Sequence, residues 1–251
     1  SVQSFAKQYK IIPTGAIDGF IANLNGNDGP KALWAANNLA NLEDQSNYAY
    51  NKQVPKDVRD IVNRYNHLQN VLPADELLKA MTPGLTMEER QNKDAIEKLF
   101  DADQTKTTGN APYKVDFNTV LGHFDPGMFS SGPVNPDYPA AAAGLHADFT
   151  EALKYNLVKT GGRMPEAMAI TLKQLDSVWG TTDIGGVRKL MAHPPEKVLP
   201  TVNGDHTWVD GQVRSDLHLG PNDRLELVSD KGTENAVAHP YTTVALGPNG
   251  R

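Results

Sequence analysis

The stretch that decides the fold is AAAAGLHADFTEALKYNLVKTGGRMPEAMAITLKQLDSVWG, residues 140–180. It predicts two amphipathic helices joined by a glycine turn. Over 140–159 apolar side chains recur every four positions, and Gly161-Gly162 then ends the helix. Over 164–179 a proline occupies the first turn and apolar residues follow one face. The residues expected on the two buried faces are Leu145, Phe149, Leu153 and Leu157, then Met168, Leu172, Leu175 and Trp179.

The first hundred residues have the same character on a smaller scale, with short helical patterns separated by proline and glycine. The cleanest helix follows Pro55. Thr86, with Glu89 three residues later, forms a capping box for another helix that runs to Phe100. We therefore expect short antiparallel helices here. The apolar face of the helix after Pro55 carries Val58, Ile61, Val62, Tyr65 and Leu68.

Regular patterns stop between residues 101 and 139, where glycine and proline are frequent and only 114–120 reads as a strand. A loop of this length is uncommon inside a compact domain and is either functional or a linker. We therefore expect three parts: a helical domain at 1–100, an irregular linker or long loop at 101–139, and a helical pair plus a small β tail at 140–251.

The tail changes from a helical to an alternating pattern. A last short helix is expected over 206–218, and two alternating segments follow it with a turn at 229–232 between them. The apolar or β-branched residues of these segments are Leu225 and Leu227, then Thr242, Val244 and Leu246. The expected fold class is thus mainly α with a small C-terminal β-element (α+β).

Composition narrows the classes of protein. The hydrophobic content is 39% and the mean hydropathy −0.48, which is low for one compact domain, so we expect an elongated shape or burial against partners. A formal net charge of −6 does not suit a dedicated nucleic-acid binder, whose surface is basic. No apolar run approaches the about 18 residues that a membrane helix needs. The chain begins at Ser1 without an initiator methionine and stops at Arg251 within an expected strand, so we expect a piece of a longer polypeptide.

One stretch resembles a calcium-binding loop. Asp101, Asp103 and Thr105 match its first three oxygen ligands. Lys106 then stands where such a loop needs glycine, and Pro112 where it needs a bidentate glutamate. A solvated helix end is the better interpretation.

Histidine and cysteine give no complete metal site either. Cysteine is absent, which excludes disulfides, thiolate ligands and cysteine nucleophiles. None of the seven histidines has helical ligand spacing. His123 with Asp125, or Asp205 with His206, could supply two zinc ligands each, and further ligands would be needed. Both pairs are interpreted more simply as polar surface.

Patterns for catalysis are equally incomplete. Ser130-Ser131 lies in a Gly/Pro loop without the strand–helix context of a nucleophile. The stretch from Gly185 to Lys189 lacks the Gly-Lys-Ser/Thr ending of a phosphate loop. For glycan cleavage the candidate acids are Glu151, Glu166 and Glu196, each of which reads as a helix-start or loop charge. The tryptophans Trp34, Trp179 and Trp208 read as core anchors. We therefore expect no catalytic residue, no cofactor-binding residue and no metal ligand.

Four segments of the last third resemble a known family. They are Trp179-Gly-Thr-Thr-Asp-Ile-Gly-Gly186, Leu190-Met-Ala-His-Pro-Pro-Glu196, Arg224-Leu-Glu-Leu-Val-Ser-Asp230 and Pro240-Tyr-Thr-Thr-Val244. Together they resemble the C-terminal part of the large internal virion proteins, or ejection proteins, of short-tailed podovirus-type bacteriophages. The helical first half is similar to this family only in style.

The resemblance implies a structural protein that is packaged inside the capsid and later reassembles in the host cell envelope, as part of a conduit for DNA. It implies a homo-oligomer, contact with other virion proteins near the portal or tail, and non-specific contact with phage DNA. Some members carry a peptidoglycan-cleaving domain, but its motif is absent here and no catalytic residue can be transferred. Two alternatives stay open: a peptidoglycan-degrading virion enzyme that uses Glu151 or Glu166, and a calcium- or carbohydrate-binding module around Asp101, Asp103 and Thr105.

Overall fold

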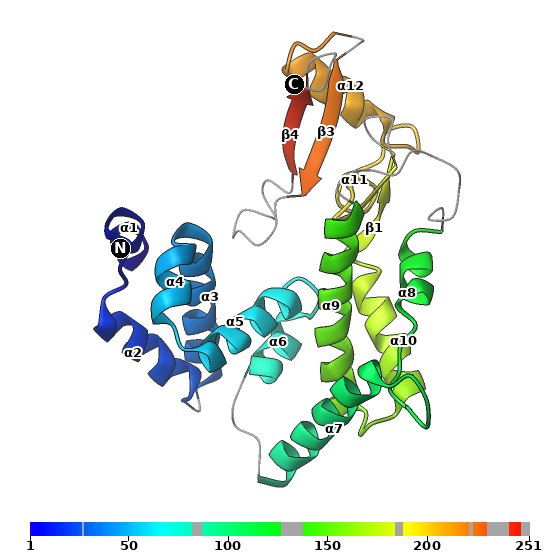
Figure 1. The fold of residues 1–251 in the computed structure, drawn as a ribbon. Helices are drawn as coiled ribbons and strands as arrows, with labels where there is room; N and C mark the ends of the chain where they lie inside the picture. The colour runs from blue at the N-terminus through cyan, green and yellow to red at the C-terminus, as the bar shows by residue number, and fades with distance from the viewer. Residues whose placement is uncertain are drawn as a thin grey trace. The chain divides into compact units, whose positions relative to one another are not determined.

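The computed structural model describes residues 1–26, 28–81, 87–126, 138–183, 188–220, 223–229 and 241–246. These ranges are mainly helical with two small antiparallel β-hairpins, so the expected fold class is confirmed (Figure 1). The helices are α1 (Val2–Tyr9), α2 (Thr14–Leu24), α3 (Gly29–Gln45), α4 (Asn47–Gln53), α5 (Lys56–Leu68), α6 (Ala74–Met81), α7 (Met87–Thr105), α8 (Phe117–Phe124), α9 (Tyr138–Lys159), α10 (Met164–Leu175), α11 (Pro195–Val198) and α12 (Thr207–Asp216). The strands are β1 (Trp179–Thr182), β2 (Lys189–Ala192), β3 (Arg224–Ser229) and β4 (Tyr241–Leu246).

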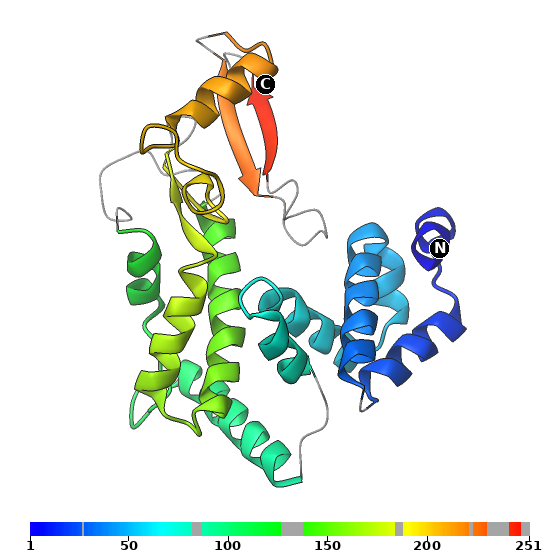
Figure 2. The ribbon, with the colours of Figure 1, turned by 180° about the vertical axis from the view of Figure 1, so that it is seen from behind.

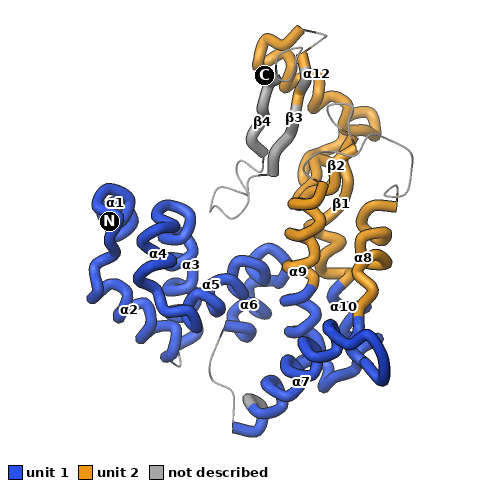
Figure 3. Tube along the Cα trace, viewed as in Figure 1, with its two compact units in different colours: residues 1–114, 150–171 blue, residues 115–149, 172–251 orange. Residues whose placement is uncertain are grey.

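The chain forms two compact units, each built from two stretches of sequence (Figure 3). Unit 1 comprises Ser1–Lys114 and Thr150–Thr171, and unit 2 comprises Val115–Phe149 and Leu172–Arg251. The chain passes from one unit to the other between α7 and α8, within α9 and within α10. These units do not coincide with the ranges 1–100, 101–139 and 140–251.

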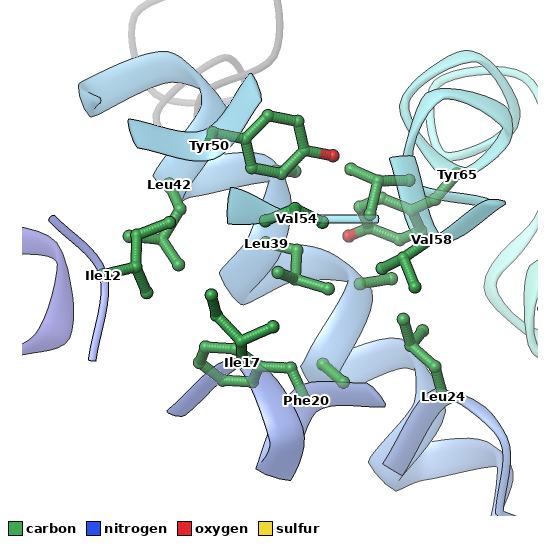
Figure 4. Close-up of a cluster of buried hydrophobic side chains, with 14 of the residues drawn as sticks. Ile12, Ile17, Phe20, Leu24, Leu39, Leu42, Tyr50, Val54, Val58 and Tyr65 are labelled. Carbon is green, nitrogen blue, oxygen red and sulfur yellow. The ribbon is translucent and has the colours of Figure 1, made fainter. Parts of the chain in front are cut away.

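Helices α1 to α6 share one apolar core in unit 1. Figure 4 shows Leu39 of α3 among Ile17 and Phe20 of α2, Tyr50 of α4 and Val58 of α5. Helix α3 starts as its sequence indicates, with a proline in the first turn and an N-cap aspartate. Burying each valine or leucine of this core contributes about 1.5–3 kcal/mol before the cost of ordering the chain.

The helix predicted after Pro55 is confirmed as α5. Its apolar face is buried at Val58, Val62, Tyr65 and Leu68, whereas Ile61 is half-buried against the same core. Spacing of three and four residues places these side chains along one stripe of the helix, which is why periodicity alone located the buried face.

The region from 101 to 139 is more regular than expected. Helix α7 continues to Thr105, five residues beyond Phe100, and the predicted strand at 114–120 is wrong because α8 forms there instead. Asp116 decides the local structure: its Oδ1 accepts a hydrogen bond from the Asn118 N–H at 3.1 Å and caps the helix. Of the predicted capping box, Thr86 and the Glu89 side chain lie outside the described residues.

Helices α9 and α10 form the predicted helical pair and lie side by side in both views (Figure 1, Figure 2). The turn between them needs glycine, because φ is 64° at Gly161 and 83° at Gly162. The Gly162 N–H donates to the Leu157 carbonyl at 2.7 Å and so closes the end of α9. The expected buried face of α9 is confirmed at Leu145, Phe149, Leu153 and Leu157.

The second helix of the pair differs from the prediction in length and in face. It ends at Leu175, and Trp179 begins strand β1 instead of closing the helix. The buried positions are Ala167, Thr171 and Leu175, while Met168 and Leu172 are half-buried. Leu175 is buried as predicted, but in the two preceding turns the buried position lies one residue earlier, at Ala167 and Thr171. The buried Thr171 hydroxyl accepts a hydrogen bond from the Asn156 amide of α9 at 2.9 Å.

The predicted β tail is confirmed as the β3–β4 hairpin, whose register runs from Arg224 opposite Leu246 to Ser229 opposite Tyr241. The helix expected over 206–218 is α12. The predicted turn lies, apart from Ser229, outside the described residues. The other hairpin, β1–β2, was not expected from the sequence.

Candidate functional site

The residues that carry the family resemblance around β1 and β2 fold into one small structure in unit 2. The two strands pair antiparallel, and the pairing extends beyond them because the His193 N–H donates to the Val178 carbonyl at 2.5 Å. The short helix α11 follows at once. We call residues 178–182 and 188–198 the hairpin site.

A buried hydrogen bond attaches the hairpin site to helix α9. The Trp179 indole Nε1–H donates to Asp148 Oδ2 at 2.8 Å, and the two side chains are 1% and 6% exposed. A carboxylate acceptor makes such a bond stronger than one between neutral groups. The bond joins residues 31 positions apart in the chain and so determines where the hairpin sits on its helix.

Lys197, itself part of the hairpin site, attaches the site to the chain just after α10. Its ammonium donates to the carbonyl oxygens of Asp176, just after α10, and of Trp179. Burial lowers the pKa of Lys197, and the nearby Asp176 carboxylate opposes that effect. Gly180 leaves room for this side chain, since a Cβ at Gly180 would lie 3.1 Å from Lys197 Cε and 3.3 Å from Pro194 Cγ.

The third attachment uses Glu196, one of the three candidate acids. The Thr182 hydroxyl donates to Glu196 Oε1 at 2.8 Å, which ties the end of β1 to α11. Glu196 therefore has a structural partner within the hairpin site.

Besides Lys197, His193 also has an altered pKa in the hairpin site. Its backbone has φ 51°, in the left-handed region. Burial lowers the pKa of the imidazole from 6.5, and the Asp148 carboxylate opposes this shift. The neutral imidazole is thus favoured in the folded protein.

Glu151, the second candidate acid, belongs to an ion-pair network in unit 1. Arg64 Nη1 lies 2.7 Å from Glu97 Oε1, and Arg64 Nε lies 3.9 Å from Glu151 Oε2. Lys154 lies 4.0 Å from Glu151 and 2.7 Å from Asp101. The structure thus brings two glutamates to one arginine, which is an arrangement that links helices by charge.

Glu166, the third candidate acid, is paired with a neighbour on the surface. Its Oε2 accepts from Arg163 Nε at 2.5 Å, and this hydrogen bond lowers the pKa of the Glu166 carboxyl. A glycosidase acid needs the opposite shift, since it must be protonated to protonate the leaving group.

The residues of the calcium-like pattern lie in the last turns of α7, and each has its own partner. Asp103 is buried, and its carboxylate accepts from Lys106 Nζ at 2.6 Å and from the Tyr113 N–H at 2.9 Å. Asp101 pairs with Lys154, and the Thr105 hydroxyl donates to the Ala102 carbonyl. Because the Lys106 ammonium already compensates the Asp103 charge, the pattern serves to pin the loop after α7. The solvated helix end expected from the sequence is wrong for Asp103.

The histidines and aspartates considered for zinc have hydrogen-bond or ion-pair partners elsewhere. His123 Nε2 lies 2.9 Å from Asp176 Oδ1, whereas Asp125 is buried and binds Arg188 Nε at 2.9 Å. The Asp205 carboxylate accepts from the hydroxyl and the N–H of Thr207. No group of three potential metal ligands occurs within the ranges that the structure describes.

Of the remaining patterns, Ser130-Ser131 and most of the glycine stretch before Arg188 lie outside the described residues. Of the three tryptophans, Trp179 is the core anchor that was expected. Trp34 is 54% exposed and lies against Phe20, and Trp208 is half-buried, so the prediction is wrong for both.

Sequence reasoning missed Asp148 and Lys197, the two residues that hold the hairpin site. Asp148 lies directly before Phe149 on a helix that was predicted from its apolar face. The only feature of the sequence that could have pointed to Asp148 is its position as a carboxylate next to that face. Lys197 gave no signal at all, because its partners are backbone carbonyls.

Compared with known proteins, the chain matches no family, no curated protein and no solved structure. No helix in the described ranges is both long and apolar enough to cross a membrane.

Proposed function

We propose that this chain is a structural segment of an internal virion protein of a podovirus-type bacteriophage, and that it oligomerises with copies of itself to help deliver the genome through the host envelope. In this proposal the protein resides inside the capsid, next to other virion proteins of the portal or tail, and reaches the host cell envelope on infection. Its contact with phage DNA is non-specific.

The observation that carries the proposal is the coherence of the resembling residues. The segments around Trp179 and Leu190 that resemble ejection proteins form one hairpin site. It is attached to Asp148 of α9 and, through Lys197, to the Asp176 carbonyl, and the Thr182–Glu196 bond ties it together internally.

The carboxylates considered for catalysis favour a structural role over an enzymatic one. Glu151, Glu166 and Glu196 each have a cation or a hydroxyl as partner within the described residues. The calcium-like residues Asp101 and Asp103 are paired with lysines. These contacts stabilise the fold.

The test is the mass of the purified chain by light scattering over a concentration series. We expect an oligomer whose mass is a fixed multiple of 27.3 kDa and whose population grows with concentration. A monomer at every concentration would contradict self-assembly. Mixing with purified portal and tail proteins of the same phage then tests the expected virion contacts.

The enzymatic alternative has its own assay. Purified peptidoglycan is incubated with the wild-type chain and with Glu151→Gln and Glu166→Gln, and the release of muropeptides is measured. We expect no release by any of the three. Release by the wild type that is lost in one variant would replace the structural proposal with a hydrolase.

A further inference from the structure

Three charged contacts within unit 1 connect the first six helices to the later ones. Arg64 of α5 pairs with Glu97 of α7 at 2.7 Å and with Glu151 of α9 at 3.9 Å. Lys159 at the end of α9 pairs with Glu76 of α6. Each of these contacts therefore joins a helix of the set α1–α6 to α7 or α9.

Helices α1 to α6 have a hydrophobic core of their own. Its buried residues extend from Ala6 to Met81 and come from α1 to α6 and the loops between them. Figure 4 shows the part of this core from Ile12 to Tyr65. Specific polar contacts complete it, since Gln53 exchanges two hydrogen bonds with the Ile12 backbone and the Ser46 hydroxyl donates to the Ala6 carbonyl. A helical cluster that buries its own apolar faces can remain folded when its outer contacts change.

Arg64 is the centre of the contact and is incompletely satisfied. Its side chain is 18% exposed, and its Nε is buried without a hydrogen-bond partner. Burial lowers the pKa of the neighbouring Lys93, and the positive charge of Arg64 adds to that shift. Partly buried ion pairs contribute little net stability, because desolvation offsets most of the attraction, but removing one partner leaves the charge of the other without its compensation.

We propose that the network centred on Arg64 is a releasable clasp, through which the cluster α1–α6 can detach from α7 and α9 while its own core stays folded. The clasp closes because Arg64 compensates two carboxylates that belong to different helices. Without its charge, α5 no longer offers a cation to Glu97 of α7 and Glu151 of α9, so the attraction between the cluster α1–α6 and these two helices is lost. This inference concerns the mechanics of unit 1 and does not depend on the proposed phage function.

The absence of cysteine allows a direct distance measurement in the full chain. Gln8 of α1 and Lys98 of α7 are exposed, so Gln8→Cys and Lys98→Cys accept one spin label each and report the separation of the two parts. In Arg64→Met we expect about tenfold more of a long-distance population, as befits the loss of a partly buried charged partner. Far-UV circular dichroism and amide exchange of α3 should stay unchanged, because the core of α1–α6 is intact.

The matched control is Lys56→Met on the same helix. Lys56 pairs with Asp60 one turn away, both side chains are largely exposed, and the pair does not leave α5. We expect this variant to keep the wild-type distance distribution. High salt should act like Arg64→Met but more weakly, because partly buried pairs are less screened than exposed ones.

Two results would overturn the clasp. An unchanged distance in Arg64→Met would mean that apolar packing holds the parts together. The buried residues Leu68, Val71 and Leu72 would then be the next to substitute. Loss of α3 protection together with the distance change would mean that the parts unfold as one. Should Arg64→Met not fold, Glu97→Gln removes one charge with the same side-chain shape, and the same distance shift, smaller in size, is expected.

Discussion

The Trp179 indole and the Asp148 carboxylate form a 2.8 Å hydrogen bond between strand β1 and helix α9, with both side chains buried. Replacing Asp148 by alanine leaves the indole N–H without its acceptor. We expect Asp148→Ala to lower the free energy of unfolding by about 1–3 kcal/mol. The measurement is the midpoint of urea unfolding, followed by tryptophan fluorescence.

Asp148→Asn provides the control, because its amide oxygen can still accept from the indole. It should lose less stability than the alanine variant. Equal losses in the two variants would show that the charge of Asp148, and not its role as acceptor, stabilises the hairpin site.

The turn between α9 and α10 offers a second prediction. An L-residue in the left-handed conformation costs about 1–2 kcal/mol, so Gly161→Ala should destabilise by that amount. Gly162→Ala should cost more, because its Cβ would lie 2.5 Å from the Tyr113 hydroxyl oxygen. In the background of Tyr113→Phe, thermal unfolding should show that part of this extra cost disappears. If Tyr113→Phe gives no relief, the contact is not what limits residue 162.

Asp103 predicts a pH dependence at the acidic end. The hydrogen bond from the Lys106 ammonium and that from the Tyr113 N–H lower the pKa of this carboxyl below 3.8. A lowered pKa means that the stabilisation is fully present above 3.8 and is lost as the pH falls through the folded-state pKa. We expect Asp103→Asn to flatten the acid limb of a plot of stability against pH below about pH 4. The acid limb of Asp103→Asn is compared with that of Asp28→Asn, which removes a carboxylate at the exposed N-cap of α3.

His193 predicts a second dependence, at higher pH. Because burial lowers its pKa from 6.5, the unfolded chain takes up a proton before the folded chain does. Stability should therefore decrease as the pH falls from 6.5 towards the folded-state pKa, and this loss should be absent in His193→Asn. Asparagine tolerates the left-handed backbone at this position. Urea unfolding of both proteins at about pH 7.5 and pH 5 checks the difference. A slope that persists in the variant would assign it to another group.

Local rules explain why much of the fold could be predicted. The apolar stripe of α5 and the glycine pair after α9 act within one or two helical turns. The alternation of Leu225 and Leu227 likewise reports a strand without knowledge of its partner. The expectation of no catalytic residue rested on similar local spacing and stays a prediction.

The errors share one cause. Residues 114–120 contain a strand-like pattern, but the capping carboxylate of Asp116 outweighs it. The helix before Trp179 was predicted to continue because an apolar residue stands at helical spacing. Trp179 instead begins β1, and its buried indole donates to Asp148 of α9. Trp34 was expected in the core because of its type, and its 54% exposure depends on where α2 lies.

The sequence by itself determined most of the helices, the glycine turn and the β tail, because the pattern of each is set by residues a few positions apart. Only the tertiary structure decided how the charged side chains are used. Asp148, Arg64 and Lys197 find their partners on other elements, at separations of 31, 33 and 87, and 18 and 21 residues. Electrostatic pairing acts through space and leaves no period in the sequence, so these residues became visible only once the helices had been brought together.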